Sequence, residues 1–208
     1  MRKLIIIGSG GHSRPVLNVA LTSKSWFVEG VIDLSYREVK EDILGIPVLG
    51  GLDFLEKIDT KDASIFIAVG DNHARRRVVL DLDCYKFSFP NIIHPSAFVS
   101  NFAEVGVGIY VGPFAHIGAK ARIGDFGVVN TFANLEHEVK VGKFAQFASN
   151  SVICGRCNIA ENVFVGANAT VINNISIAKN TIIGAGSVVV RDIVDQGQKI
   201  VGVPGRAI

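Results

Sequence analysis

The adjacent pair His137-Glu138 is the combination in this sequence best suited to proton transfer. A neutral imidazole can accept a proton near neutral pH, and a neighbouring carboxylate can orient the ring and stabilise the imidazolium that forms. The other histidines have no comparable carboxylate neighbour; they are His12, His73, His94 and His116. The pair therefore indicates a general base, with ordinary solvent exposure of a surface histidine as the alternative.

A glycine loop near the N-terminus could hold phosphate. Gly8-Ser9-Gly10-Gly11-His12 follows the apolar run Leu4–Ile7 and precedes a helical pattern. Backbone N–H groups and a helix N-terminus at such a loop favour anions. Ser13 stands where a dinucleotide fingerprint would have its third glycine, and about 90 residues supply only half of a dinucleotide-binding fold. A nucleotide-sugar diphosphate suits this smaller site, and a tight turn without a ligand is the alternative.

The spacing of Cys154 and Cys157 is typical of some metal and redox sites, yet two cysteines supply at most two of the four ligands of a structural zinc site. Cys157 also falls at the fifth position of the surrounding repeat, which is small in most hexads and faces the core. We expect core packing here and no metal.

These residues must be positioned by a six-residue repeat that runs from residue 93 to 188 without an insertion. The first residue of each hexad is apolar: Ile93, Val99, Val105, Val111, Ile117, Ile123, Val129, Leu135, Val141, Phe147, Ile153, Ile159, Val165, Val171, Ile177 and Ile183. The fifth is mostly small, as at Ala133 and Ser151, while glycine recurs at the second position and asparagine at the fourth, where tight corners could require positive φ. This pattern predicts a parallel β-helix.

The preceding residues predict a different fold. Apolar runs predict strands at residues 4–7, 27–32, 46–50 and 64–69, and helical patterns lie at 16–21 and 72–80. Alternating strands and helices indicate a small α/β domain with a parallel sheet, half of a Rossmann-like fold. We place the domains at 1–90 and 91–208, with Pro90 and Pro95 at the transition.

Composition narrows the function classes. The 208 residues are 49% hydrophobic and carry a net charge of +2, too little to suggest a nucleic-acid partner or a membrane surface. The apolar run after Arg2 and Lys3 is too short for an export signal or a membrane span, and three cysteines form no pairing framework. We therefore expect a cytoplasmic protein.

Several motifs in order resemble one family over the whole chain. They are Gly8-Ser9-Gly10-Gly11-His12, Ile92-Ile93-His94-Pro95-Ser96-Ala97, Asn130-Thr131, Glu136-His137-Glu138 and Val201-Gly202-Val203-Pro204-Gly205-Arg206. The chain resembles the hexapeptide-repeat sugar acyltransferases, which include bacillosamine-pathway UDP-4-amino-sugar N-acetyltransferases and sialic acid O-acetyltransferases. The resemblance implies a left-handed β-helix in which three hexads form one coil of 18 residues.

The resemblance also implies the roles of individual residues. His137 matches the catalytic base, Glu138 its acidic partner, Asn130 a polar active-site residue, and Gly155, one coil above His137, the backbone donor to the thioester carbonyl. Acetyl-CoA would contact Gln146, Gly155, Ala167 and Ala185. The nucleotide sugar would contact Gly10, Gly11, His12, Asp33, Leu34 and Gly70. Two departures are Ser13-Arg14-Pro15 after the loop histidine, and Gln146 where a histidine is common.

The implied activity is N-acetylation, by acetyl-CoA and without a metal, of the amine of a nucleotide-linked 4-amino-4,6-dideoxy sugar, with UDP favoured. O-acetylation of sialic acid or a related sugar is the alternative, and a non-catalytic binding solenoid is a further one. The family assembles as a homotrimer with sites between subunits. Aromatic residues at fourth positions of the repeat would suit such an interface, or would pack against the N-terminal domain; they are Phe102, Phe114, Phe126, Phe132 and Phe144.

Overall fold

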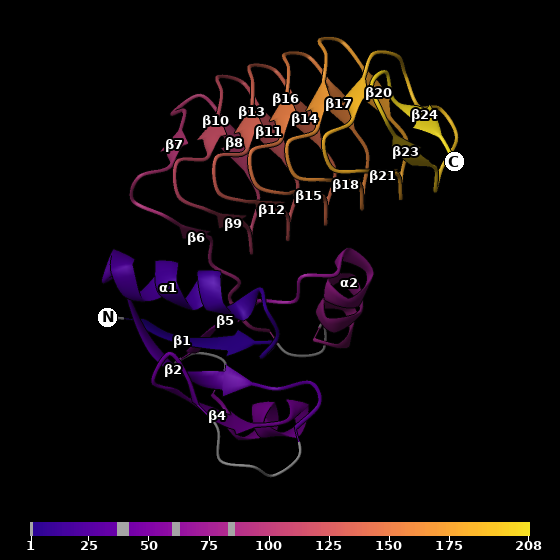
Figure 1. The fold of residues 1–208 in the computed structure, drawn as a ribbon. Coiled ribbons are helices and arrows are strands. Elements are labelled where there is room, and N and C mark those ends of the chain that lie inside the picture. Colours follow the sequence, from indigo (N-terminus) through magenta and orange to yellow (C-terminus); the bar gives the residue numbers. More distant parts are fainter. Residues whose placement is uncertain (1, 37–41, 60–62, 83–85) are drawn as a thin grey trace. The chain divides into compact units, whose positions relative to one another are not determined.

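The computed structural model describes residues 2–36, 42–59, 63–82 and 86–208. It separates into two compact units, Met1–His94 and Pro95–Ile208 (Figure 1). The boundary predicted near residue 90 lies slightly ahead of this division.

The N-terminal unit is built on one small sheet. Its strands are β1 (Arg2–Ile7), β2 (Trp26–Ile32), β3 (Asp42–Ile43), β4 (Ile46–Gly50) and β5 (Ala63–Ile67), in the order β3-β4-β2-β1-β5. All pairings are parallel except that of β3 with β4. Its helices are α1 (Ser13–Ser23), the 3-10 helix η1 (Leu52–Lys57) and α2 (Asn72–Asp81), and the short strand β6 (Ile92–Ile93) ends the unit.

Branched apolar side chains make β1 the centre of this sheet. Its residues from Leu4 to Ile7 are at most 1% exposed, and β1 lies between β2 and β5. A strand covered on both faces requires such a continuous apolar run. The predicted parallel α/β domain is confirmed, and β3 and η1 are elements that the sequence pattern did not predict.

The second unit is a parallel β-helix of two-residue strands. They are β7 (Phe98–Val99), β8 (Glu104–Val105), β9 (Tyr110–Val111), β10 (His116–Ile117), β11 (Arg122–Ile123), β12 (Val128–Val129), β13 (Asn134–Leu135), β14 (Lys140–Val141), β15 (Gln146–Phe147), β16 (Val152–Ile153), β17 (Asn158–Ile159), β18 (Phe164–Val165), β19 (Thr170–Val171), β20 (Ser176–Ile177), β21 (Ile182–Ile183) and β22 (Val188–Val189). Figure 1 shows the coils stacked one after another. The predicted β-helix is confirmed, and its left hand follows from the match to known hexapeptide-repeat proteins described below.

Each strand pairs with the strands three places before and three places after it in the chain, so one coil contains 18 residues. Leu135 pairs with Ile117 on one side and Ile153 on the other. The resulting sheets run β22-β19-β16-β13-β10-β7, β20-β17-β14-β11-β8 and β21-β18-β15-β12-β9, the last extended by β23 (Lys199–Val201) and β24 (Arg206–Ala207). The three faces form because every hexad contributes one strand and one corner.

The hexad pattern describes the interior of the β-helix correctly. Leu135 and Ile153 at first positions and Ala133 and Ser151 at fifth positions have no exposed surface. Branched and small side chains alternate because each coil is narrow and must fill its interior without voids.

The two kinds of corner residue behave differently from each other. Asparagines at fourth positions adopt positive φ, such as 60° at Asn150, as predicted. The glycines at second positions do not adopt it, and that expectation was wrong. They are needed because the next coil approaches closely: a Cβ on Gly142 would lie 2.5 Å from the backbone nitrogen of Glu161.

Candidate active site

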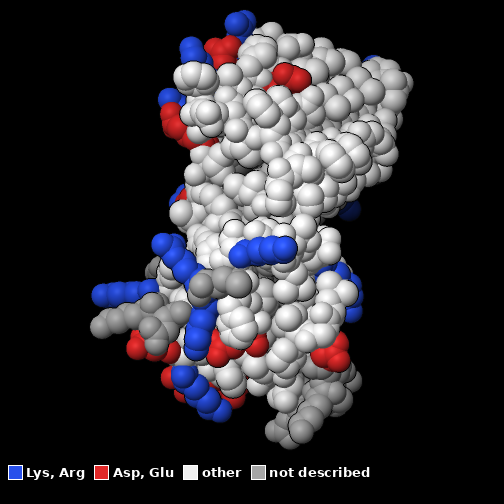
Figure 2. Space-filling view, turned by 90° about the vertical axis from the view of Figure 1, so that its left-hand side faces the viewer, with Lys and Arg blue, Asp and Glu red and all other residues white. Residues whose placement is uncertain are grey.

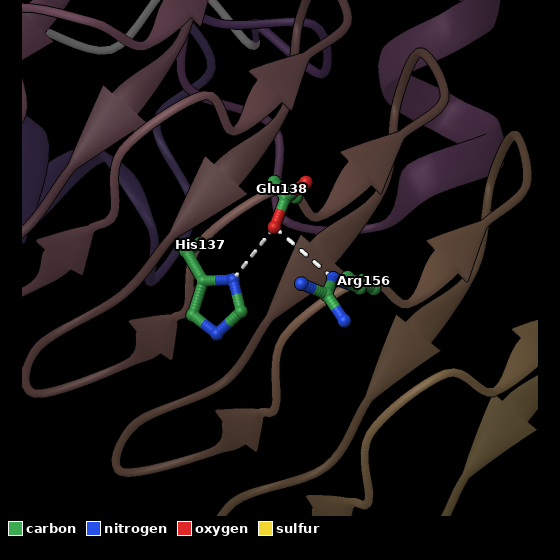
Figure 3. A network of polar contacts seen from close by, with 3 residues as sticks. All are labelled: His137, Glu138 and Arg156. Carbon is green, nitrogen blue, oxygen red and sulfur yellow. Dashed lines mark hydrogen bonds and ion pairs between the residues drawn. The ribbon is translucent and has the colours of Figure 1, made fainter.

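His137 stands at the corner that follows β13, where its side chain is half exposed. Its Nδ1 lies 3.1 Å from Oε2 of Glu138, the next residue (Figure 3). An ionised carboxylate can only accept hydrogen bonds, so in the neutral form of the ring Nδ1 carries the proton and Nε2 has the free lone pair. The predicted base and acid are therefore joined, with Nε2 directed away from the carboxylate (Figure 3).

Arg156 is a third member of this network that the sequence did not reveal. Its Nε donates to the same Oε2 of Glu138 at 3.1 Å (Figure 3). Hydrogen bonds from Arg156 and then His137, together with the charge of Arg156, hold the pKa of Glu138 below its usual value. Glu138 is thus an anion at neutral pH. The signal that could have found Arg156 is its spacing of 18 residues, one coil, from Glu138.

Gly155 lies against the imidazole ring of His137. A Cβ on Gly155 would lie 2.5 Å from both Cε1 and Nε2 of that ring, so only glycine fits beside this histidine. Within the described residues, the Gly155 N–H donates to no other group. The structure thus brings together three of the four predicted catalytic residues, with one backbone donor left open beside the ring.

Asn130, the fourth, lies elsewhere. It follows β12, and the corner at Phe132 and then β13 separate it from His137. Its side-chain oxygen accepts the N–H of Thr131 at 2.8 Å. We name the corner after β9, β12, β15, β18 and β21 the Asn130 edge, and the corner after β13 and β16 the His137 edge. One chain does not join these two edges into a single site.

The remaining predicted coenzyme residues lie with Asn130. Ala167 follows β18 and Ala185 follows β21, so they stand one coil apart on the Asn130 edge, and Gln146 is in β15, which leads to the same edge. Ala167 is half-buried and Ala185 exposed. Only Gly155 of this predicted set is on the His137 edge.

The six residues predicted to hold the nucleotide sugar line one cavity of about 320 Å³ in the N-terminal unit. They are Gly10, Gly11, His12, Asp33, Leu34 and Gly70. The carboxyl ends of β1, β2 and β5 meet here, which is where open α/β sheets commonly bind ligands.

Two arginines support this cavity. Arg75 is only 1% exposed, and its NH1 donates to the carbonyls of Val69 and Gly70. Arg14 donates to the carbonyls of Ser9 and Gly10. The burial of Arg75 depends on the conformation of the loop between β5 and α2, which the sequence alone does not specify.

His12 is a partly buried titratable group of the cavity. Desolvation, and next the charge of Arg75, lower its pKa to about 4. It is therefore neutral at pH 7 and adds no charge to the cavity.

Three further features of the described residues concern Cys157, potential metal ligands and membrane-spanning helices. Cys157 is buried and donates to the carbonyl of Ile172, which agrees with a core position. Within the described ranges, no group of three or more potential metal ligands is found. None of the helices in those ranges has the length and apolar character needed to cross a bilayer.

Charged side chains are unevenly distributed on the face drawn in Figure 2. Over the N-terminal unit, blue and red side chains are interspersed. The β-helix unit is mostly uncharged in this view, and most of its few charges gather at the upper left. Such a surface is compatible with burial against another chain, since interface cores are depleted in charge.

Known families match both units. Residues 3–82 match the PglD N-terminal domain, and residues 156–191 match the bacterial transferase hexapeptide (six repeats). UDP-N-acetylbacillosamine N-acetyltransferase of Bacillus subtilis (strain 168) is 32% identical over 114 residues, 53% of this chain and 51% of that protein. The alignment thus spans about half the length of this curated relative.

Solved structures extend the match over the whole chain. A histidine-to-asparagine mutant of perosamine N-acetyltransferase from Caulobacter crescentus, in complex with CoA and GDP-perosamine, has a TM-score of 0.94 and 32% identity, covering 100% of this chain and 97% of that one. The acetyltransferase domain of PglB from Neisseria gonorrhoeae FA1090 with acetyl coenzyme A has a TM-score of 0.91 and 29% identity, covering 100% and 99%. With both units matched over their full length, the chain belongs to the sugar acyltransferase family of hexapeptide-repeat enzymes with a left-handed β-helix.

Proposed function

We propose that this chain transfers the acetyl group of acetyl-CoA to the amine of a nucleotide-linked 4-amino-4,6-dideoxy sugar. The hydrogen bond between His137 and Glu138 carries the proposal, because it leaves Nε2 as a base beside the open N–H of Gly155. The relatives support it: two are named as N-acetyltransferases, one of UDP-N-acetylbacillosamine and one of perosamine. Neither they nor the PglB domain provide support for O-acetylation of sialic acid.

The proposed transfer proceeds directly between the two substrates. The sugar amine attacks the thioester carbonyl and forms the C–N bond, while Nε2 of His137 takes the proton from nitrogen. The tetrahedral intermediate then breaks its C–S bond, and the leaving CoA thiolate takes the proton from the imidazolium. General base catalysis of this kind contributes about 10²–10⁴ in rate.

Glu138 and Gly155 support the two charges that develop. The carboxylate of Glu138 stabilises the imidazolium through Nδ1. The Gly155 N–H would donate to the oxyanion of the tetrahedral intermediate, which is the usual role of an open backbone donor beside a catalytic base.

Acetyl-CoA would lie along the Asn130 edge. Ala167 and Ala185 present small side chains one coil apart there, which leaves room for an extended pantetheine arm, and Gln146 adds a polar group on the same face. The chemistry that the coenzyme supplies is an activated acyl thioester. Residues of this chain would bind the coenzyme, and His137 would accept and return the proton.

The nucleotide sugar would bind in the cavity of the N-terminal unit, with its diphosphate at the Gly10-Gly11 loop and the start of α1. Sequence resemblance favours UDP. The perosamine N-acetyltransferase, whose match covers the whole chain, is described with GDP-perosamine, so GDP stands beside UDP as a candidate.

We further propose that the active site forms between subunits of a homotrimer. Asn130 and the coenzyme residues lie on one edge and His137 on another, so a complete site requires the Asn130 edge of a second copy. Phe114 and Phe132 lie on the Asn130 edge with stacked rings, 59% and 54% exposed, and suit an interface. Phe126 and Phe144 are only 8% and 6% exposed, so these two do not offer the interface surface expected of the fourth-position aromatics.

The test is CoA release from acetyl-CoA with a panel of acceptors. UDP-, dTDP- and GDP-linked 4-amino-4,6-dideoxy sugars are compared with free sialic acid, using the wild-type protein and His137→Ala. We expect release with one nucleotide amino sugar and its loss in the variant. Release only with sialic acid would replace N-acetylation by O-acetylation, and no release with any acceptor would contradict the proposed function.

A further inference from the structure

One oxygen of Glu138 accepts two hydrogen bonds, and the second donor has no role in the mechanism above. Nδ1 of His137 and Nε of Arg156 both lie 3.1 Å from Oε2 (Figure 3). The side chain of Glu138 is 43% exposed. A carboxylate this exposed has several rotamers open to it, and only some of them reach Nδ1.

Arg156 restricts that freedom from the neighbouring coil. It occupies the corner one coil after Glu138, and its backbone N–H is bonded to the carbonyl of His137 at 3.0 Å. The backbone of Arg156 is therefore hydrogen-bonded to that of His137, the residue whose ring must be oriented. A rigid, planar guanidinium is well suited to fix a carboxylate.

A second arginine of the same unit provides a comparison. Arg122 also contacts a glutamate one coil away: its Nε lies 3.3 Å from Oε2 of Glu104. The side chain of Arg122 is 62% exposed, and that of Arg156 is 64% exposed. No hydrogen bond to histidine is found for Glu104 within the described residues. The two pairs have the same chemistry and the same spacing of one coil. Arg122 and Glu104 lie in strands, whereas Arg156 lies at a corner, and only the Arg156 pair is connected to the base.

We propose that Arg156 is a positioning residue for acetyl transfer: it holds Glu138 in the orientation that accepts Nδ1–H of His137, so that Nε2 faces the acceptor amine. The kinetic consequence rests on the proposed function, whereas the orientation of the ring does not. The two are therefore measured separately.

The chain itself suggests the variant. The backbone at Arg156 has φ 64°, and asparagine occupies other fourth positions of the repeat with φ between 58° and 64°; these are Asn150, Asn162, Asn168, Asn174 and Asn180. Arg156→Asn thus removes the guanidinium and inserts a residue that this corner accommodates. Arg122→Asn is the matched control, and Arg156→Lys retains the charge without the planar fork.

The first measurement is the tautomer of His137 from the ¹⁵N shifts of its ring, assigned by comparison with His137→Ala. We expect the Nδ1–H form in the wild-type protein and in Arg122→Asn. We expect a mixture of both tautomers in Arg156→Asn. An unchanged tautomer in Arg156→Asn would overturn the proposal whether or not any acceptor is acetylated.

The second measurement is a double-mutant cycle on kcat with the acceptor found above. We expect Arg156→Asn to lower kcat about tenfold with the KM values of both substrates nearly unchanged, and Arg156→Lys to recover part of the loss. In a Glu138→Gln background, Arg156→Asn should change kcat less than about twofold, because Arg156 acts through Glu138.

Other kinetic outcomes would overturn the inference. The same tenfold loss in the Glu138→Gln background would show that Arg156 acts on its own or on the fold. A higher KM for acetyl-CoA at unchanged kcat would make Arg156 a coenzyme contact. Failure of the wild-type protein to release CoA with any acceptor would refute the proposed function, and the tautomer would still decide the role of Arg156.

Discussion

The Cα of Gly155 lies so close to the ring of His137 that a methyl group there would be 2.5 Å from Nε2. This contact joins two coils of the β-helix at the atom proposed to accept the proton. The ring of His137 is therefore the reason that position 155 must be glycine. The repeat itself does not demand glycine there, because third positions elsewhere carry alanine, as at Ala167 and Ala185.

Gly155→Ala should therefore disable the base without disrupting the coil. The new methyl group pushes the ring aside, and a misplacement of about 1 Å can cost on the order of 10²-fold in rate. The measurement is kcat together with the melting temperature. In a His137→Ala background the second change should have no further effect on kcat, because the ring is absent; an additional large loss there would place the damage elsewhere.

His137→Ala should lower kcat by about 10²–10⁴, the usual contribution of a general base. The affinity for acetyl-CoA should stay nearly the same, because the remaining coenzyme residues lie on the Asn130 edge. Steady-state kinetics and calorimetric titration with CoA measure the two effects. His73→Ala, at an exposed position of α2, serves as the control, and unchanged turnover in His137→Ala would rule out the assigned base.

The N-terminal unit should lose stability as the pH falls from about 6.5 to about 4. Burial lowers the pKa of His12 to about 4 in the folded protein, whereas the unfolded chain takes up this proton near 6.5. The unfolded state thus binds more protons in this window, and the free energy of unfolding falls by up to about 3 kcal/mol, the equivalent of the shift.

Urea unfolding at several pH values, for the wild-type protein and His12→Gln, measures this effect. The difference between the two isolates His12 from the carboxylates that titrate in the same range. Parallel curves for wild type and His12→Gln would show that His12 does not contribute.

Phe132→Glu should weaken self-association and acetyl transfer together. A charge in place of an aromatic ring that is 54% exposed and stacked on Phe114 opposes burial between chains. Native mass spectrometry should give about 67 kDa for the wild-type protein, three times 22.3 kDa, and a smaller species for the variant. Phe27→Glu, at a position 55% exposed in the other unit, is the control. A fully active wild-type monomer would contradict a shared site.

The six-residue pattern was sufficient to predict the β-helix and its interior. Each hexad places its first and fifth side chains inward, so a periodic sequence determines the core without long-range information. Most strands and both α-helices of the N-terminal unit follow in the same way from local apolar runs, whereas β3 and η1 do not. The pairing of His137 with Glu138 was also readable, because the two are adjacent in the chain.

Only the tertiary structure showed what neighbouring coils and loops bring together. Arg156 meets Glu138 because the coil returns after 18 residues, and Arg75 is buried with its guanidinium bonded to carbonyls of the loop after β5. The separation of Asn130 from His137 likewise depends on which corner each residue occupies. These relationships join residues from different coils, or a helix to the loop before it, and depend on packing that a local sequence pattern does not specify.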